Sequence, residues 1–181
     1  MFPLSESSQK ELLSLARQSI REFLQTRRKT LRNSNNPELQ SWAGVFVSLH
    51  RHGKLRGCIG VITASSPLLE VVQECAVSAA TSDPRFEPLT LGELEESIIE
   101  ISVLSPLEPI QDVGKINVGI HGLLVSQHGR RGLLLPQVAT EQGWDGETFL
   151  AQTCRKAGLP MDAWHKGAEI SIFTAAVFQE K

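Results

Sequence analysis

The hydrophobic positions of the chain follow two periods, one typical of helices and one typical of strands. Apolar residues spaced three and four apart predict helices at about residues 12–29, 68–81 and 146–157. Alternating apolar and polar residues predict strands at 42–49, 55–62, 97–105, 118–127, 133–135 and 168–178. Two pairs of these strands are joined by short glycine-containing turns, so each pair forms a hairpin. The pattern therefore predicts an α+β fold with mainly antiparallel pairing.

Polar residues before the apolar runs predict where helices begin. Ser8 and Thr90 each precede a glutamate by three residues, which is the spacing of a capping box. Ser66, followed by proline, and Asp145 are further candidate N-caps. Gly158 fits the left-handed position that closes a helix.

Composition limits the class of protein. The 181 residues are 41% hydrophobic and 21% charged, which suits a globular chain that can bury a core. We find no repeat, no low-complexity segment and no clean linker, so we expect one domain over residues 1–181 that can divide into two lobes. The formal charge of −2 lacks the basic surplus of a nucleic-acid-binding protein.

Compartment and cofactors are constrained by what the sequence lacks. No apolar run is long enough to span a membrane, and Met1–Glu6 has no signal-peptide character. We therefore expect a cytoplasmic protein. Its three cysteines, Cys58, Cys75 and Cys154, are too widely spaced to indicate a disulfide framework or a metal site. No phosphate-binding loop or dinucleotide fingerprint is present either, so we expect no cofactor.

The stretch Leu55–Gly60 is the most unusual part of the chain, because a predicted strand there contains two glycines, an arginine and a cysteine. Alternation along a strand predicts that Arg56 and Cys58 share one face, with Gly57 between them. A thiolate at Cys58, activated by Arg56 and a base, is one interpretation, and an inert thiol packed in a strand is the other. We expect a shielded thiol and an exposed Arg56 that binds an anion.

Four other residues are candidates for the same chemistry. His121 lies in an apolar pattern and is the preferred base, whereas His50 and His52 flank a turn and are interpreted as solvated. Glu100 lies within an apolar strand, where a carboxylate is paired, exposed or functional. Asp83 and Arg85 flank Pro84 and either stiffen that turn or present a guanidinium to an anion.

Several stretches together resemble the AMMECR family, also known in microbes as AmmeMemoRadiSam system protein A. They begin with the LRGCIG motif at Leu55–Gly60 and include 83–90, 100–104, 119–123, 134–138, 141–145 and 154–159. The resemblance implies an α+β fold in which both ends of the chain build a larger lobe, with a smaller lobe between them. It implies no established activity, and it associates the chain with a Memo-like protein and a radical SAM protein.

Two functions are compatible with this sequence. The first is an accessory subunit that binds a partner protein or a small anionic ligand, for which Arg56, Gly57, Asp83 and Arg85 are the candidate binding residues. The second is a cofactor-independent enzyme with Cys58 as nucleophile and His121 or Glu100 as base. Binding to nucleic acid is disfavoured by the charge balance.

Overall fold

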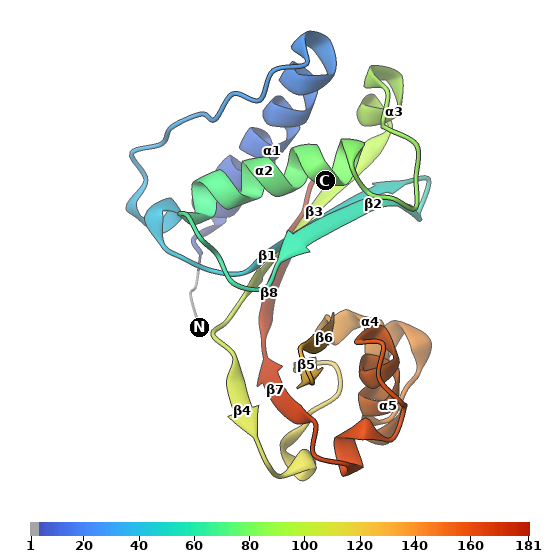
Figure 1. The fold of residues 1–181 in the computed structure, drawn as a ribbon. Coiled ribbons are helices and arrows are strands. Elements are labelled where there is room, and N and C mark those ends of the chain that lie inside the picture. The colour runs from blue at the N-terminus through green and yellow to red at the C-terminus, as the bar shows by residue number, and fades with distance from the viewer. Residues whose placement is uncertain (1–3) are drawn as a thin grey trace. The chain divides into compact units, whose positions relative to one another are not determined.

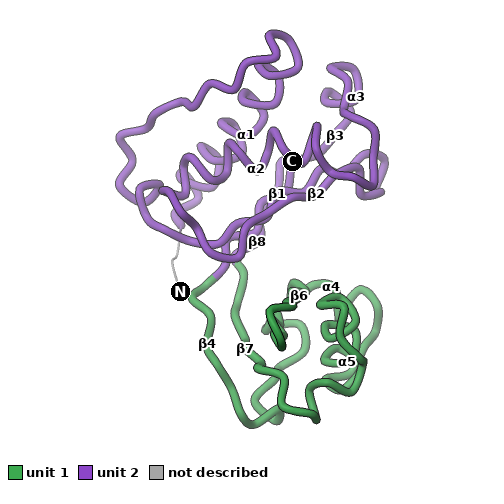
Figure 2. Tube along the Cα trace, in the orientation of Figure 1, with its two compact units in different colours: residues 1, 105–175 green, residues 2–104, 176–181 purple. Residues whose placement is uncertain are grey.

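The structure, a computed structural model, describes residues 4–181, so Met1–Pro3 of the segment inspected for a signal peptide lie outside it (Figure 1). The described residues form two compact units (Figure 2). Unit 1 comprises residues 105–175, and unit 2 comprises residues 4–104 with 176–181. Both ends of the chain therefore build the larger unit, as the family resemblance implies.

Unit 2 is a four-stranded sheet with helices packed on one face. Its sheet has the strand order β2-β1-β3-β8, and β1 pairs antiparallel with both β2 and β3. Its elements are α1 (Glu6–Thr26), η1 (Pro37–Gln40), β1 (Val45–Arg51), β2 (Lys54–Val61), α2 (Leu68–Thr81), α3 (Leu91–Glu95), β3 (Ser97–Leu104) and β8 (Ala175–Gln179). The predicted hairpin at 42–62 is confirmed.

The core of unit 2 explains why the strands alternate. Fully buried Val47, Leu49, Ile99 and Ile101 pack with apolar residues of α1 and α2. Every second residue of β1 and β3 therefore faces the helices, and the residues between them form the opposite side. We call that side the outer face; on β1 and β3 it carries Phe46, Ser48, His50, Ile98, Glu100 and Ser102.

The predicted helix starts were correct at some positions and wrong at others. Thr90 and Glu93 form the predicted capping box of α3, and Asp145 caps α5. Ser8 does not cap α1, because the hydroxyl of Ser5 accepts the Ser8 N–H and the helix begins one turn earlier. Ser66 makes no capping hydrogen bond at the start of α2, which begins directly after Pro67.

Unit 1 has its own sheet and its own core. The sheet order is β4-β7-β5-β6, and all three of its pairings are antiparallel. Its elements are β4 (Glu108–Ile110), η2 (Val113–Lys115), β5 (Gly122–Gln127), β6 (Arg130–Leu134), α4 (Pro136–Gln142), α5 (Gly146–Lys156), η3 (Ala163–His165) and β7 (Glu169–Phe173). Phe149, Leu150 and Cys154 of α5 are buried in its core.

The last predicted strand, 168–178, is in fact two strands. Residues 169–173 form β7 of one sheet, and 175–179 form β8 of the other, with Thr174 between them. The chain thus returns from unit 1 to unit 2 in the middle of a continuous alternating pattern. The predicted start at residue 118 is also wrong, because β5 begins at Gly122 and residues 117–121 form a turn.

Over residues 4–181, no helix combines the length and the apolar character needed to cross a membrane. Nor do three or more His, Cys, Asp or Glu side chains of this range gather as a potential metal site.

Candidate functional site

A row of three polar side chains crosses the middle of the unit 2 sheet. Ser48 on β1 is the direct partner of Cys58 on β2 and of Glu100 on β3. Side chains of directly paired residues lie on the same face, so the thiol, the hydroxyl and the carboxylate share the outer face. The Ser48 hydroxyl donates a hydrogen bond of 3.2 Å to Cys58 Sγ. Glu100 lies on the other side of Ser48, so its Cα atom is two strand spacings, about 10 Å, from the Cα atom of Cys58.

A second row lies beside the first and is mainly apolar. His50 pairs with Leu55 on one side and with Ile98 on the other. Leu55 and Ile98 are 38% and 42% exposed, which is high for large apolar side chains on strands. His50 Nε2 is buried without a hydrogen-bond partner among the described residues, and lies 4.0 Å from Glu100 Oε1. The interpretation of His50 as a turn residue is wrong, because it lies within β1, but its side chain is 34% exposed.

The Cys58 thiol is held in its protonated form. Burial raises its pKa above the ordinary value, although the Ser48 hydrogen bond and the Arg85 guanidinium act in the opposite direction. A thiol with a raised pKa is a weak nucleophile at neutral pH, because the thiolate is the reactive form. The local environment therefore favours an unreactive Cys58.

Asp83 covers the free edge of strand β2. Its carboxylate accepts the Cys58 N–H at 2.9 Å and the Arg85 N–H at 3.0 Å, and its side chain is only 2% exposed. The Arg85 guanidinium and these two N–H groups hold the pKa of the Asp83 carboxyl well below its ordinary range. The turn at residues 83–86 is thereby fixed to the strand that carries Cys58.

Arg85 has one occupied side and one exposed side. Its Nε and Nη2 donate to Asp83 at 3.0 and 2.8 Å, and Nη2 also lies 3.4 Å from the Cys58 carbonyl oxygen. The side chain is nevertheless 52% exposed. Its remaining donors are therefore available to an anion that approaches the edge of β2.

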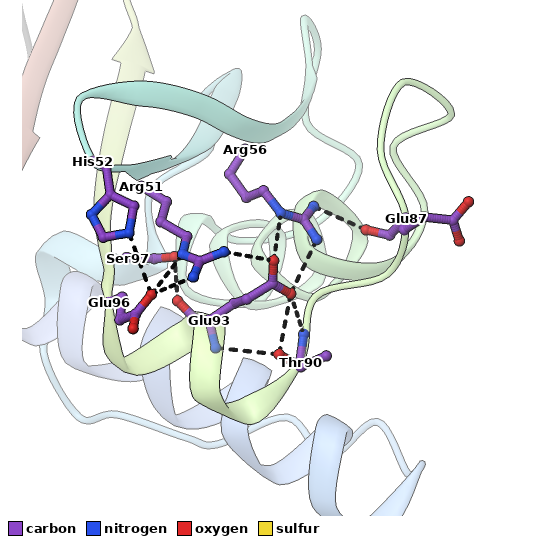
Figure 3. Close-up of polar contacts among 8 residues, drawn as sticks. All are labelled: Arg51, His52, Arg56, Glu87, Thr90, Glu93, Glu96 and Ser97. Carbon is purple, nitrogen blue, oxygen red and sulfur yellow. Dashed lines mark hydrogen bonds and ion pairs between the residues drawn. The ribbon is translucent and has the colours of Figure 1, made fainter.

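Arg56 is bound within unit 2 (Figure 3). Its guanidinium makes two contacts of 3.2 Å with the carboxylate of Glu93 on α3 and donates to the Glu87 carbonyl at 2.9 Å. The side chain is only 17% exposed. The expectation of an exposed Arg56 that binds an external anion is therefore wrong, because Glu93 already supplies that anion.

The reason lies in an irregularity of the hairpin. Leu49 pairs with Gly57 but His50 pairs with Leu55, so Arg56 is an extra residue in a β-bulge. A bulge interrupts the alternation on which the shared face of Arg56 and Cys58 was predicted. The two side chains have different partners, since Cys58 contacts Ser48 and Arg56 contacts Glu93.

Glu93 both caps α3 and binds the two arginines near the turn of the hairpin. Its carboxylate accepts the Thr90 N–H and also contacts Arg51 Nη1 at 3.1 Å. The Thr90 N–H and the Arg56 guanidinium lower the pKa of the Glu93 carboxyl to about 2. Figure 3 shows the Glu93 carboxylate of α3 between the guanidinium groups of Arg51 and Arg56. Glu93 was predicted only as a capping residue.

The glycines of the motif allow close packing. A Cβ atom at Gly57 would collide with the carbonyl oxygen of Ala79 on α2, and one at Gly60 would collide with the Phe46 ring. Gly57 is therefore needed for the approach of helix α2, and Gly60 lets the aromatic ring lie over β2.

His121 lies in unit 1, apart from the other candidates in sequence and in compact unit. It closes the turn before β5, where its Nδ1 accepts the Asn117 N–H at 3.2 Å. A role for His121 as the base that serves Cys58 remains a prediction.

The structure thus brings Cys58, Asp83 and Arg85 together, with Glu100 on the same sheet. It adds Ser48 and His50, which sequence reasoning did not select. The hairpin register could have identified Ser48, because Ser48 is the polar residue opposite Cys58. The position of Glu100 beside Ser48 depends on pairing with β3, which the sequence pattern alone does not determine.

Comparison with known proteins agrees with the motifs and the fold. A family model described as AMMECR1 matches residues 13–178. A protein of Methanothermobacter thermautotrophicus is 42% identical, with 98% of this chain and 97% of that protein aligned. The protein MK0488 of Methanopyrus kandleri is 45% identical over 94% of this chain and 87% of its own length.

A solved structure is similar over nearly the whole fold. It is the crystal structure of the uncharacterized protein PH0010 from Pyrococcus horikoshii, with a TM-score of 0.90 and 43% identity. The alignment covers 94% of this chain and 90% of that one. The chain is a member of the AMMECR1 family.

Proposed function

We propose that this chain is a binding subunit that receives a partner protein on the outer face of unit 2. The observation that carries the proposal is the row formed by exposed Leu55 and Ile98 with His50 between them. Exposed apolar side chains grouped on one face of a sheet are typical of surfaces that a partner covers.

The candidate partners are a Memo-like protein and a radical SAM protein, the two with which the family resemblance associates this chain. A small anionic ligand at the exposed side of Arg85 is compatible with the same role. Both modes use the strand that carries the LRGCIG motif, the first through its side chains and the second through its edge.

A cofactor-independent enzyme with Cys58 as nucleophile is the second candidate. The Ser48 hydrogen bond and the nearby Arg85 favour it, because both lower the pKa of the thiol. Burial outweighs them, however, and Glu100 is separated from Cys58 by Ser48.

The proposal can be tested by co-expressing the chain with the Memo-like and radical SAM proteins of the same organism. We expect a complex on size-exclusion chromatography, and we expect Leu55→Asp with Ile98→Asp to weaken it at least about tenfold. Val113→Asp is the matched control, because Val113 is a similarly exposed apolar residue (37%) in unit 1.

Either of two results would refute the proposed surface. One is that the variant with Leu55→Asp and Ile98→Asp binds both proteins as tightly as the parent and the Val113→Asp control do. The other is that the parent binds neither protein. Circular dichroism of each variant separates loss of binding from loss of folding.

A further inference from the structure

A hollow of about 330 Å³ in unit 1 is lined by an indole ring, a leucine and three polar side chains. Leu134 ends β6, Trp144 lies between α4 and α5, and Gln152, Arg155 and Lys156 lie on α5. Its size is at the lower end of the range for small-molecule sites.

Three of the stretches that resemble the AMMECR family meet at this hollow. Residues 134–138 contribute Leu134, residues 141–145 contribute Trp144, and residues 154–159 contribute both cations. The role proposed above for unit 2 uses none of these stretches. The hollow lies entirely within unit 1, so the inference drawn from it does not depend on that role.

Local structure fixes each wall of the hollow. The backbone N–H of Trp144 donates to the Ala139 carbonyl at 2.9 Å, and the indole ring packs partly against the core of unit 1. Asp145 then caps α5, whose last turn presents Arg155 and Lys156. Cations are favourable at this end of a helix, because the helix dipole is negative there.

The two cations are unengaged within residues 4–181. Neither Arg155 nor Lys156 makes an ion pair or a side-chain hydrogen bond with another residue of this range. By contrast, Arg130 donates to the Gly158 carbonyl and Lys166 pairs with Asp162 in the same unit. The hollow therefore combines positive charge with free hydrogen-bond donors.

The indole ring of Trp144 lines the hollow, and none of the ring–ring or cation–π contacts of the described residues involves it. The cation–π contacts of the described chain place Arg56 and Arg85 over Phe86, and neither Arg155 nor Lys156 lies over Trp144. An aromatic face at the wall of a hollow is a surface on which a flat ring can stack. Leu134 extends the same apolar wall.

We infer that this hollow binds a small aromatic anion, a planar ring that carries a phosphate or a carboxylate. The ring stacks on Trp144 and contacts Leu134, and the anionic group accepts hydrogen bonds from Arg155 and Lys156. The Gln152 amide can donate to or accept from a polar edge of the ring. A ring without charge, or an anion without a ring, uses only half of the site.

The test follows the Trp144 indole N–H signal in an NMR titration with AMP and, separately, with indole-3-acetate. These probes distinguish a nucleotide from an aromatic carboxylate. We expect at least one of them to bind with a dissociation constant below about 1 mM. Adenosine or indole alone, and inorganic phosphate or acetate alone, should bind at least about tenfold more weakly.

Matched variants assign the binding to the hollow. The double variant Arg155→Gln with Lys156→Gln should bind the probe at least about tenfold more weakly than the parent does, whereas Lys166→Gln should bind it with unchanged affinity. The two Trp144 variants lack the indole N–H, so their affinity is measured from the NMR signals of the probe. Trp144→Phe keeps an aromatic ring and should retain part of the affinity, and Trp144→Leu should lose it. The inference is overturned if neither probe shifts the Trp144 signal, or if the double variant binds as the parent does. The inference is overturned as well if the probe that binds has no higher affinity than its anion alone, which is phosphate for AMP and acetate for indole-3-acetate.

Discussion

Replacing Gly57 by alanine is expected to destabilise the protein by about 3 kcal/mol. The new methyl group would collide with the Ala79 carbonyl oxygen of α2, so helix and sheet must separate. The backbone cannot yield as a flexible side chain can, because this carbonyl lies within a packed helix. Urea unfolding followed by circular dichroism measures the effect.

Gly92→Ala is the matched control for this change. Gly92 lies in the short helix α3 of the same unit, and a Cβ atom there meets nothing within 4 Å. Alanine is the better helix former by about 1 kcal/mol, so this variant should be as stable as the parent or slightly more so. Equal stability of the two variants would show that the contact of Gly57 with α2 is not tight.

Replacing Asp83 by asparagine is expected to cost about 2 kcal/mol of unfolding free energy. The carboxylate accepts from two backbone N–H groups and from Arg85, and it is nearly fully buried. An amide retains one acceptor oxygen and turns an NH₂ group toward donors. Thermal unfolding at neutral pH measures the difference.

The same variant should change the response of stability to acid. Because the folded-state pKa of Asp83 is depressed, its contribution is present above the ordinary value of 3.8 and is lost as the pH falls below it. The parent should therefore lose more stability than Asp83→Asn in that acid range. Parallel curves would contradict the role given to the ionised carboxylate.

Arg85→Gln distinguishes the two kinds of partner that Asp83 has. Arg85 is half exposed, so solvent screens its ion pair with Asp83. The N–H of Cys58, in contrast, loses its acceptor when the Asp83 carboxylate is removed. We expect Arg85→Gln to cost less than Asp83→Asn. The opposite order would mean that the ion pair, and not the edge of β2, fixes the turn.

The elements of the fold were largely readable because they depend on local pattern. The capping box at Thr90, the first hairpin and helix α5 follow from residues close in sequence. The division of 168–178 at Thr174 was not readable, because both halves alternate in the same way. Which sheet each half joins is decided by strands far away in the chain.

The site was readable only in part, for the same physical reason. Alternation correctly gave Cys58 a face opposite Gly57, which packs on α2. It could not reveal the bulge at Arg56, since an extra residue changes register without changing composition. The neighbours Ser48, His50 and Glu100 come together through pairing between β1 and β3, whose residues are some fifty positions apart.

We propose that the motif strand is part of a binding surface and that Cys58 is not a nucleophile. The most direct test is the pH dependence of iodoacetamide labelling at Cys58, read by mass spectrometry. Cys75 provides an internal reference, because burial raises its pKa to about 12 and it should not react in the folded protein.

We expect slow labelling of Cys58 at neutral pH, with a rate that increases with pH and does not level off until the pH is above the ordinary thiol pKa of 9.0. Arg85→Gln should slow the labelling further, because loss of the guanidinium raises the pKa of the thiol and so decreases the small fraction of thiolate. Fast labelling near neutral pH that slows in Arg85→Gln would contradict the account and would identify Cys58 as an activated nucleophile.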